Sequence, residues 1–498
     1  MMRRALLCLA LAAPPAAAQG FRLRLDAQAQ AVAYRGVRLD SIAVTDTVAG
    51  VGGGPVTPEG IAAYCVPGLA YCTFFRPGAV RRGGPFTTTA DVTIWGFGVS
   101  GLSVHALTRV GAALGSADAW PATSPAVQLL EGYAEYAQPR FTLRLGRQVE
   151  AAPLGFTGFD GGAITVRPAR VPVDVSGYVG WGLAQATALP VTSAALNPLD
   201  DFQPVQRQLV AGAAAGYRSA LADVRLSYER QVDRRSRYFV SERARVDAVI
   251  RPLTHWSLSG SGMYDMAQGL WGNAEVRLGY QAPSGVVNAS VALRRYRPDF
   301  DLWTIWGVFS PVPYRAVDGA IDLAPLARLH VHATGEAYRY DDAAASTPLF
   351  TIETSGWRFS WDADYALDPR WSVDAGYHAE FGPGAASRGF TGGVTYAAGD
   401  RVTLSAHAGT LARPLEFRSE DVAVRMYGVR MELRPNERWR VQTEATAYNE
   451  ASHRLDAAGV DWNQVRLSAR VVWTFGSGLP SPSVPAAVQA MPQAPAHQ

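Results

Sequence analysis

The chain has 498 residues, a formal net charge of +3, 18% charged residues and a mean hydropathy of −0.02. All 46 basic residues are arginines and 43 acidic residues nearly balance them, so no nucleic-acid partner is expected. No stretch approaches about eighteen continuous apolar residues, which excludes a membrane protein built from helices.

Residues 1–18 have the pattern of a secretory signal peptide. A basic start at Arg3 and Arg4 precedes an apolar run, and Ala16 to Ala18 form an A-x-A cleavage site. We therefore expect the mature chain to leave the cytoplasm. An outer-membrane β-barrel and a soluble periplasmic protein both fit that export.

The first expected strand covers residues 19–35, where apolar residues alternate with polar ones. A long Gly/Pro-rich segment, 36–85, follows and is predicted to be a large surface loop or a constriction folded into the molecule. It contains Cys65 and Cys72, the two cysteines left after the signal peptide. An oxidising compartment favours a local disulfide between them. Because no further Cys or His lies nearby, no metal is expected there, and the sequence indicates no cofactor.

The clearest strand pair runs from Trp357 to Phe381. Apolar and polar residues alternate on both sides of a turn at 367–370, and each half has about the ten residues that a tilted strand needs to cross a bilayer. The apolar positions of the first half are Trp357, Phe359, Trp361, Ala363, Tyr365 and Leu367. One apolar and one polar face per strand, with aromatic residues at the strand ends, is typical of a transmembrane barrel.

Short turns and long loops alternate along the rest of the chain. Aromatic residues follow several of the short turns directly, at Phe141, Trp256, Trp371 and Trp439. This repeat predicts an all-β fold over residues 19–475, a transmembrane antiparallel up-and-down β-barrel of about 18–22 strands with both termini in the periplasm. We expect its apolar face to contact outer-membrane lipid.

The last strand is expected at 463–475 and ends on Phe475, as the terminal strand of an assembled outer-membrane barrel normally does. This ending suggests the barrel-assembly machinery as a partner. Residues 476–498 are rich in Pro and Ala and show no periodicity, so we expect a disordered periplasmic tail.

Two patterns suggest other chemistry but fit the barrel better. Residues 96–101 match G-x-G-x-x-G, yet the next residues alternate as a strand, which predicts a glycine-rich turn and no nucleotide site. His330, His332 and Glu336 share one strand face, but a lumen-facing polar row explains them better than a metal site. Without a hydrolase motif, we expect no enzyme.

The polar face supplies the candidate functional residues. Burying so many charges in a packed interior would cost several kcal/mol for each one left unpaired, whereas a wide barrel encloses water. We therefore expect a charged, water-filled lumen. The candidate pore-lining residues are Arg144, Arg225, Arg243, Arg245, Arg277, Arg294, Arg358, Asp362, Asp364, Asp374, Glu380, Arg440, Glu444, Arg466 and Arg470.

One passage resembles a known family. Leu145-Gly146-Arg147-Gln148, followed by residues 154–161, is similar to the "LGRQ … G…FDG" passage of alginate-export-type outer-membrane barrels. The resemblance covers about residues 140–165 and implies a monomeric barrel that passes an anionic polysaccharide along an arginine-lined lumen. The near balance of acidic and basic residues on the polar face argues against a conduit of that selectivity.

Three functional hypotheses follow. The first is a porin-like channel for passive passage of small polar solutes. The second is a dedicated exporter of (poly)saccharide or anionic solutes, with residues 149–160 and inward arginines at its constriction. The third is a surface protein without transport, in which the barrel anchors residues 36–85. A siderophore-type receptor needs a large plug domain before its barrel. The segment 36–85 after the first strand is too short for such a domain, so we discount this receptor class.

Overall fold

The computed structural model describes residues 20–50, 53–115, 127–183, 208–232, 240–297, 313–341, 354–382, 385–413, 422–452 and 463–476. The expected signal peptide lies outside these residues, as does the expected tail apart from Gly476, which ends the last strand. No helix in the described part of the chain is long and apolar enough to cross a membrane.

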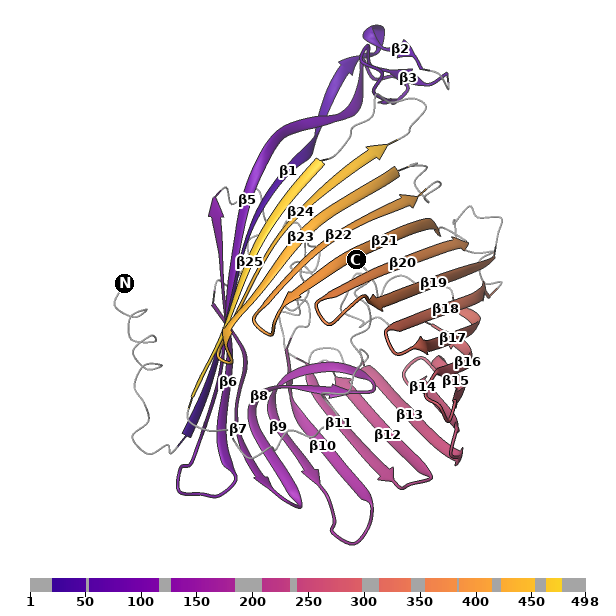
Figure 1. The fold of residues 1–498 in the computed structure, drawn as a ribbon. Coiled ribbons are helices and arrows are strands. Elements are labelled where there is room, and N and C mark those ends of the chain that lie inside the picture. Colours follow the sequence, from indigo (N-terminus) through magenta and orange to yellow (C-terminus); the bar gives the residue numbers. More distant parts are fainter. Residues whose placement is uncertain are drawn as a thin grey trace.

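Twenty-two strands form one closed antiparallel barrel (Figure 1). The main sheet has 23 strands, of which the short β4 (Ala63–Cys65) pairs only with β5. The barrel closes because β1 pairs with both β5 and β25. The barrel strands are β1 (Gly20–Ala43), β5 (Tyr71–Trp95), β6 (Leu102–Gly115), β7 (Val127–Gln138), β8 (Phe141–Ala152), β9 (Gly155–Val166), β10 (Val173–Gly182), β11 (Leu209–Arg218), β12 (Ala222–Val232), β13 (Val240–Leu253), β14 (Trp256–Asp265), β15 (Leu270–Gln281), β16 (Val287–Tyr296), β17 (Tyr314–Leu326), β18 (Leu329–Tyr340), β19 (Ser355–Ala366), β20 (Trp371–Gly382), β21 (Ala385–Ala398), β22 (Val402–Arg413), β23 (Val422–Asn436), β24 (Trp439–Ser452) and β25 (Asn463–Gly476).

The hairpin of β19 and β20 shows how the alternating sequence produces this barrel. Trp357 pairs with Phe381 and Ala366 with Ser372, as the alternation predicts. The Asp368 carboxylate closes the turn by accepting hydrogen bonds from the backbone N–H groups of Arg370 and Trp371. Trp357 and Phe359 are exposed on one face of the hairpin. The predicted fold class and strand number are confirmed.

Aromatic side chains form a girdle at the end of the barrel that carries the short turns. Ring contacts join neighbouring strands there, between Tyr136 and Phe141, Trp256 and Tyr280, Trp371 and Tyr396, Trp439 and Trp473, and Phe21 and Phe475. The start of β1 and the end of β25 lie at the same end, because Arg22 pairs with Gly476. In outer-membrane barrels this end faces the periplasm.

The β1–β5 hairpin extends far beyond the opposite rim, which corrects the loop expected at 36–85. Pairing between β1 and β25 stops at Ala33, and pairing between β5 and β6 stops at Gly83. Beyond these points residues 34–43 pair with residues 71–81, which adds about 30 Å of ribbon beyond the rim, and β4 joins β5 near its tip (Figure 1). We call this ribbon and its tip, residues 34–82, the arm.

The Gly and Pro content of residues 36–85 predicted a loop, and this prediction was wrong because the ribbon accommodates both residue types. Gly36 lies at a register shift between Arg35 and Val37, and Pro77 pairs with Val37 in a ribbon whose outer edge bonds to no further strand. A proline on such an edge removes no ladder hydrogen bond. The strands therefore continue through residues whose composition is typical of a loop.

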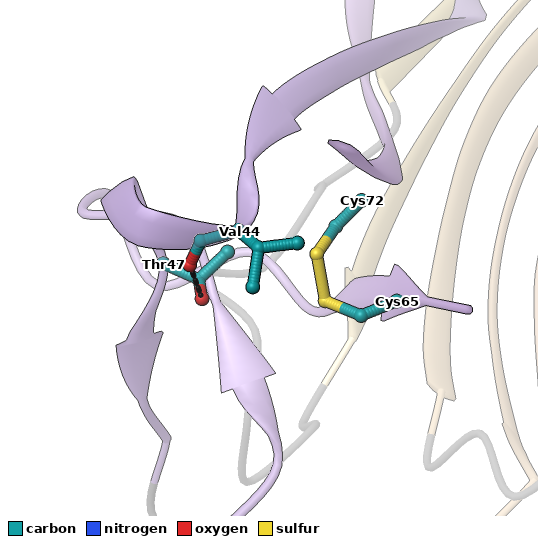
Figure 2. Close-up of a disulfide and its surroundings, with 4 residues drawn as sticks. All are labelled: Val44, Thr47, Cys65 and Cys72. Carbon is teal, nitrogen blue, oxygen red and sulfur yellow. Dashed lines mark hydrogen bonds between the residues drawn. A yellow bond between two sulfur atoms is a disulfide. The ribbon is translucent and has the colours of Figure 1, made fainter. Parts of the chain in front are cut away.

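The tip of the arm has its own small core beside the predicted disulfide, which is confirmed. Cys65 of β4 bonds to Cys72 of β5 (Figure 2). Cys72, Ala63 and Phe74 are buried together. The chain is further held where Val44 N–H donates to the carbonyl oxygen of Ala70 at 3.0 Å. The short strands β2 (Val48–Ala49) and β3 (Pro55–Val56) and a 3-10 turn at Val44–Asp46 complete the tip.

Replacing both cysteines with serine should loosen this tip and leave the barrel intact. Closing so short a loop is worth about 2–3 kcal/mol in the chain-entropy account. We expect protease to cut the variant within the arm under conditions in which the native arm resists. The barrel band should stay resistant and heat-modifiable on a gel. Equal protease resistance of the two arms would show that the small apolar core alone holds the tip.

Candidate pore

The polar face of the strands is the concave, inner face of the barrel. Side chains on this face contact partners two strands away. Such contacts indicate a concave surface, because side chains on a convex surface diverge from one another. Arg277 of β15 contacts Asp318 of β17 at 2.9 Å, and Arg225 of β12 contacts Asp174 of β10 at 3.4 Å. The opposite face carries exposed apolar residues such as Leu145, Ile164 and Leu226. The two faces are therefore a charged inner wall and an apolar outer wall.

Most of the predicted pore-lining arginines take part in ion pairs on the inner wall. Their side chains keep part of their surface exposed, for example 27% for Arg144 and 34% for Arg225. The pairs are Arg144 with Glu135, Arg225 with Asp174, Arg245 with Asp247, Arg277 with Glu275 and Asp318, Arg294 and Arg358 with Glu336, Arg440 with Glu432, and Arg470 with Asp26.

The remaining predicted residues make polar or ring contacts. Arg243 donates to Ser241, and Glu444 accepts from Thr446. The Arg466 guanidinium lies over the Tyr448 ring at 5.6 Å, and Glu380 accepts a hydrogen bond from Tyr338 at 3.3 Å. The alternation of residues along each strand placed these charges on one face, but it did not predict which charges would form pairs.

A cluster of arginines and tyrosines lies near the rim opposite the termini. Glu336 of β18 accepts hydrogen bonds from both Arg294 of β16 and Arg358 of β19, and its side chain is only 8% exposed. The guanidinium of Arg294 lies over the ring of Tyr314 at 5.9 Å, and that of Arg358 lies over the ring of Tyr338 at 5.4 Å. Glu336 is therefore shared by two arginines, while Glu275 lies directly opposite Arg294 and Glu380 directly opposite Arg358 in the strand register.

Nearer the end that carries the short turns, the inner wall between β17 and β22 bears aspartate and histidine instead of arginine. His332 lies directly between Asp322 and Asp362 in the strand register, and Asp364 lies directly between His330 and Asp374. His332 Nδ1 is 2.6 Å from an Asp322 carboxylate oxygen. The predicted aspartates Asp362, Asp364 and Asp374 all belong to this group. The described inner wall thus has an acidic sector beside its arginine-bearing sectors.

The β8–β9 hairpin folds into the barrel instead of continuing the wall. Thr157 near the tip of this hairpin donates a 2.6 Å hydrogen bond to Glu229 of β12. Strand β12 lies three strands away from β9, about 14 Å along the wall, so the tip must cross the inner face of β10 and β11. We call residues 148–159 the constriction hairpin.

Glycines make room for the constriction hairpin on the wall. The Phe159 and Tyr178 rings stack at 5.1 Å between centroids, and a Cβ at Gly180 or Gly212 would collide with them. Tyr178 donates to Glu229, which also accepts from Gln231 at 2.7 Å. Phe159 is fully buried and Glu229 is 6% exposed.

The other two sequence patterns have structural roles. Residues 96–101 form the turn between β5 and β6, with positive φ angles at Gly96, Gly98 and Gly101 that favour glycine. This confirms the glycine-rich turn. His332 contacts Asp322, and Glu336 binds two arginines. Among the described residues, no group of three or more His, Cys, Asp or Glu side chains is placed to hold a metal ion.

No family model matches the chain, and no curated protein matches its sequence. The resemblance to alginate-export barrels therefore stays an expectation. The chain is similar to a ferric enterobactin receptor of Pseudomonas aeruginosa in complex with enterobactin, with a TM-score of 0.52 and 8% identity over 90% of this chain and 81% of that one. OccK9 and the outer-membrane protein OpdK, both from Pseudomonas aeruginosa, match with TM-scores of 0.37 at 10% identity, over 91% and 92% of this chain and 98% and 99% of theirs. The fold is that of a bacterial outer-membrane β-barrel.

Proposed function

We propose that the protein is an outer-membrane, porin-like channel for passive passage of small polar solutes, narrowed by its constriction hairpin. One observation carries this proposal. The closed barrel has charged side chains with partly exposed head groups on its inner wall, while its apolar side chains face outward. Charges that stay hydrated inside a closed wall need water beside them, and a continuous water path is a channel.

The charge distribution suggests the class of solute. The pore-lining residues include both signs, and the acidic sector on β17–β22 lies beside arginine-bearing sectors. Such a wall suits small polar or weakly anionic solutes better than a long polyanion, which would meet Asp362, Asp364 and Asp374. The exporter hypothesis is for that reason the weaker one. The proposal assigns no catalytic step to the chain.

The outer wall suggests the surroundings of the channel. Exposed Val, Leu and aromatic residues cover the outer wall beside the aromatic girdle, which suits contact with lipid. Strand β25 ends with Trp473 and Phe475, whose rings pack on the girdle. We infer that this strand is the part that the barrel-assembly machinery recognises.

Liposome swelling tests passive passage directly. Vesicles containing the refolded protein are placed in isotonic solutions of uncharged sugars of increasing size, and the rate of swelling is recorded. We expect fast swelling with monosaccharides and a sharp decline for larger oligosaccharides, because the constriction hairpin limits the cross-section. Empty vesicles are the control. If the protein-containing vesicles swell no faster than these with any sugar, the passive channel is refuted and a barrel that only anchors the arm becomes the better account.

A further inference from the structure

The arm carries a set of exposed arginines that the channel does not need. Arg38, Arg76, Arg81 and Arg82 are all exposed on the ribbon that rises from the rim. Asp40 is the acidic residue of this ribbon, and it pairs with Arg76 at 2.8 Å. Among the described residues, none accepts a hydrogen bond or forms an ion pair with Arg38, Arg81 or Arg82. The ribbon therefore presents a net positive charge outside the barrel.

These arginines lie at the rim of the barrel and beyond it. Arg82 pairs with Ala33, the last β1 residue that β25 also contacts, and so lies at the rim of the barrel. Arg38 and Arg76 face each other about 15–20 Å further along the ribbon. The arm leaves the rim opposite the termini, which is the extracellular side in outer-membrane barrels (Figure 1).

The outer part of the arm adds an exposed aromatic face. In the strand register Leu39 lies opposite Phe75, Ala43 opposite Tyr71 and Tyr64 opposite Thr73, so these residues share one face of the ribbon. Tyr64, Tyr71 and Phe75 are 57%, 62% and 50% exposed. These exposed rings offer flat apolar area to sugar rings.

We infer that the arm binds the phosphorylated saccharide headgroups of glycolipids in the outer leaflet around the barrel. Guanidinium groups recognise phosphate through paired hydrogen bonds, and each basic residue near an anionic lipid surface strengthens binding by about fivefold. The arginines at the rim meet the lipid-proximal phosphates, and the aromatic face above them meets the outer sugars. Charge complementarity selects this partner over an uncharged glycan.

The test compares binding of one glycolipid to three forms of the full-length protein in detergent. The probe is lipopolysaccharide with intact phosphates, titrated by thermophoresis. In the arm variant, Arg38, Arg76, Arg81 and Arg82 are replaced with serine. In the control variant, four exposed arginines on the short-turn side, Arg140, Arg170, Arg251 and Arg438, are replaced with serine. Both variants lose the same charge, and an unchanged heat-modifiable band shows that both barrels are folded.

We expect the arm variant to bind more than a hundredfold more weakly and the control variant to bind as the wild type does. The affinity of the wild type for the probe should fall by a similar factor when the probe is dephosphorylated, and added salt should also weaken this binding. Equal affinity of the arm variant and the wild type, or an equal loss in the control, would overturn the proposal. Undiminished binding of the dephosphorylated probe would also overturn it, because the arginines would then have no phosphate partner.

Discussion

Replacing residues 150–157 with Asn-Gly is expected to raise the single-channel conductance on the order of twofold. Val149 and Gly158 are directly paired, so a two-residue turn joins them without disturbing the strands below. The replacement removes the tip of the constriction hairpin, which crosses the inner face of β10 and β11 to reach Glu229. The open cross-section then increases, and with it the current at a given voltage.

A second hairpin at the same rim provides the matched control. Asp265 and Leu270 are directly paired, so replacing residues 266–269 with Asn-Gly shortens the β14–β15 hairpin in the same way without a residue that crosses the lumen. Its conductance should equal that of the wild type. If both replacements change conductance equally, or neither does, the β8–β9 hairpin does not form the constriction.

Replacing Glu336 with glutamine is expected to make the channel more anion-selective. The change removes the carboxylate shared by Arg294 and Arg358, so the inner wall loses one negative charge beside two guanidinium groups. One unit charge about 4 Å from a passing ion is worth about 1 kcal/mol in water, so the local preference for anions rises by about fivefold. The reversal potential across a KCl gradient measures the change, which should move toward the chloride equilibrium potential. Stability should fall on the order of 1–3 kcal/mol.

Glu242 serves as the control for charge alone. It accepts a hydrogen bond from Tyr228 and lies opposite Arg230, on the face that carries the exposed Leu226. Replacing Glu242 with glutamine removes the same charge from the outer wall, so the reversal potential should not move. If the reversal potential shifts equally in both variants, the overall protein charge determines the ion selectivity and the Arg294–Arg358 cluster does not.

The sequence was sufficient to predict the barrel because each strand repeats one simple requirement. A membrane-spanning strand needs about ten alternating residues, and the hairpin at 357–381 meets that requirement on both sides of its turn. The short turns and the aromatic residues after them then predicted the strand number and the end at which the termini lie. These features depend only on neighbours along the chain.

The sequence placed residues 149–160 at a constriction, but the arm and the contact that holds those residues inward could not be predicted because both depend on distant partners. Residues 34–43 are strand only because residues 71–81 pair with them, and Gly36 and Pro77 obscure the pattern. The inward fold of the β8–β9 hairpin depends on Thr157 reaching Glu229, 72 residues later. The glycines at 180 and 212 were a signal of close packing, but the sequence did not show which rings they would meet.

Single-channel recording of the refolded protein in a planar bilayer tests the central claim most directly. The account predicts stable, ohmic steps with mild ion selectivity, because the closed barrel has hydrated charges of both signs on its inner wall. The same preparation must show a heat-modifiable, folded band. A folded protein that gives no steps across a range of salt and voltage would contradict the channel, and the arm would then be the functional part of the molecule.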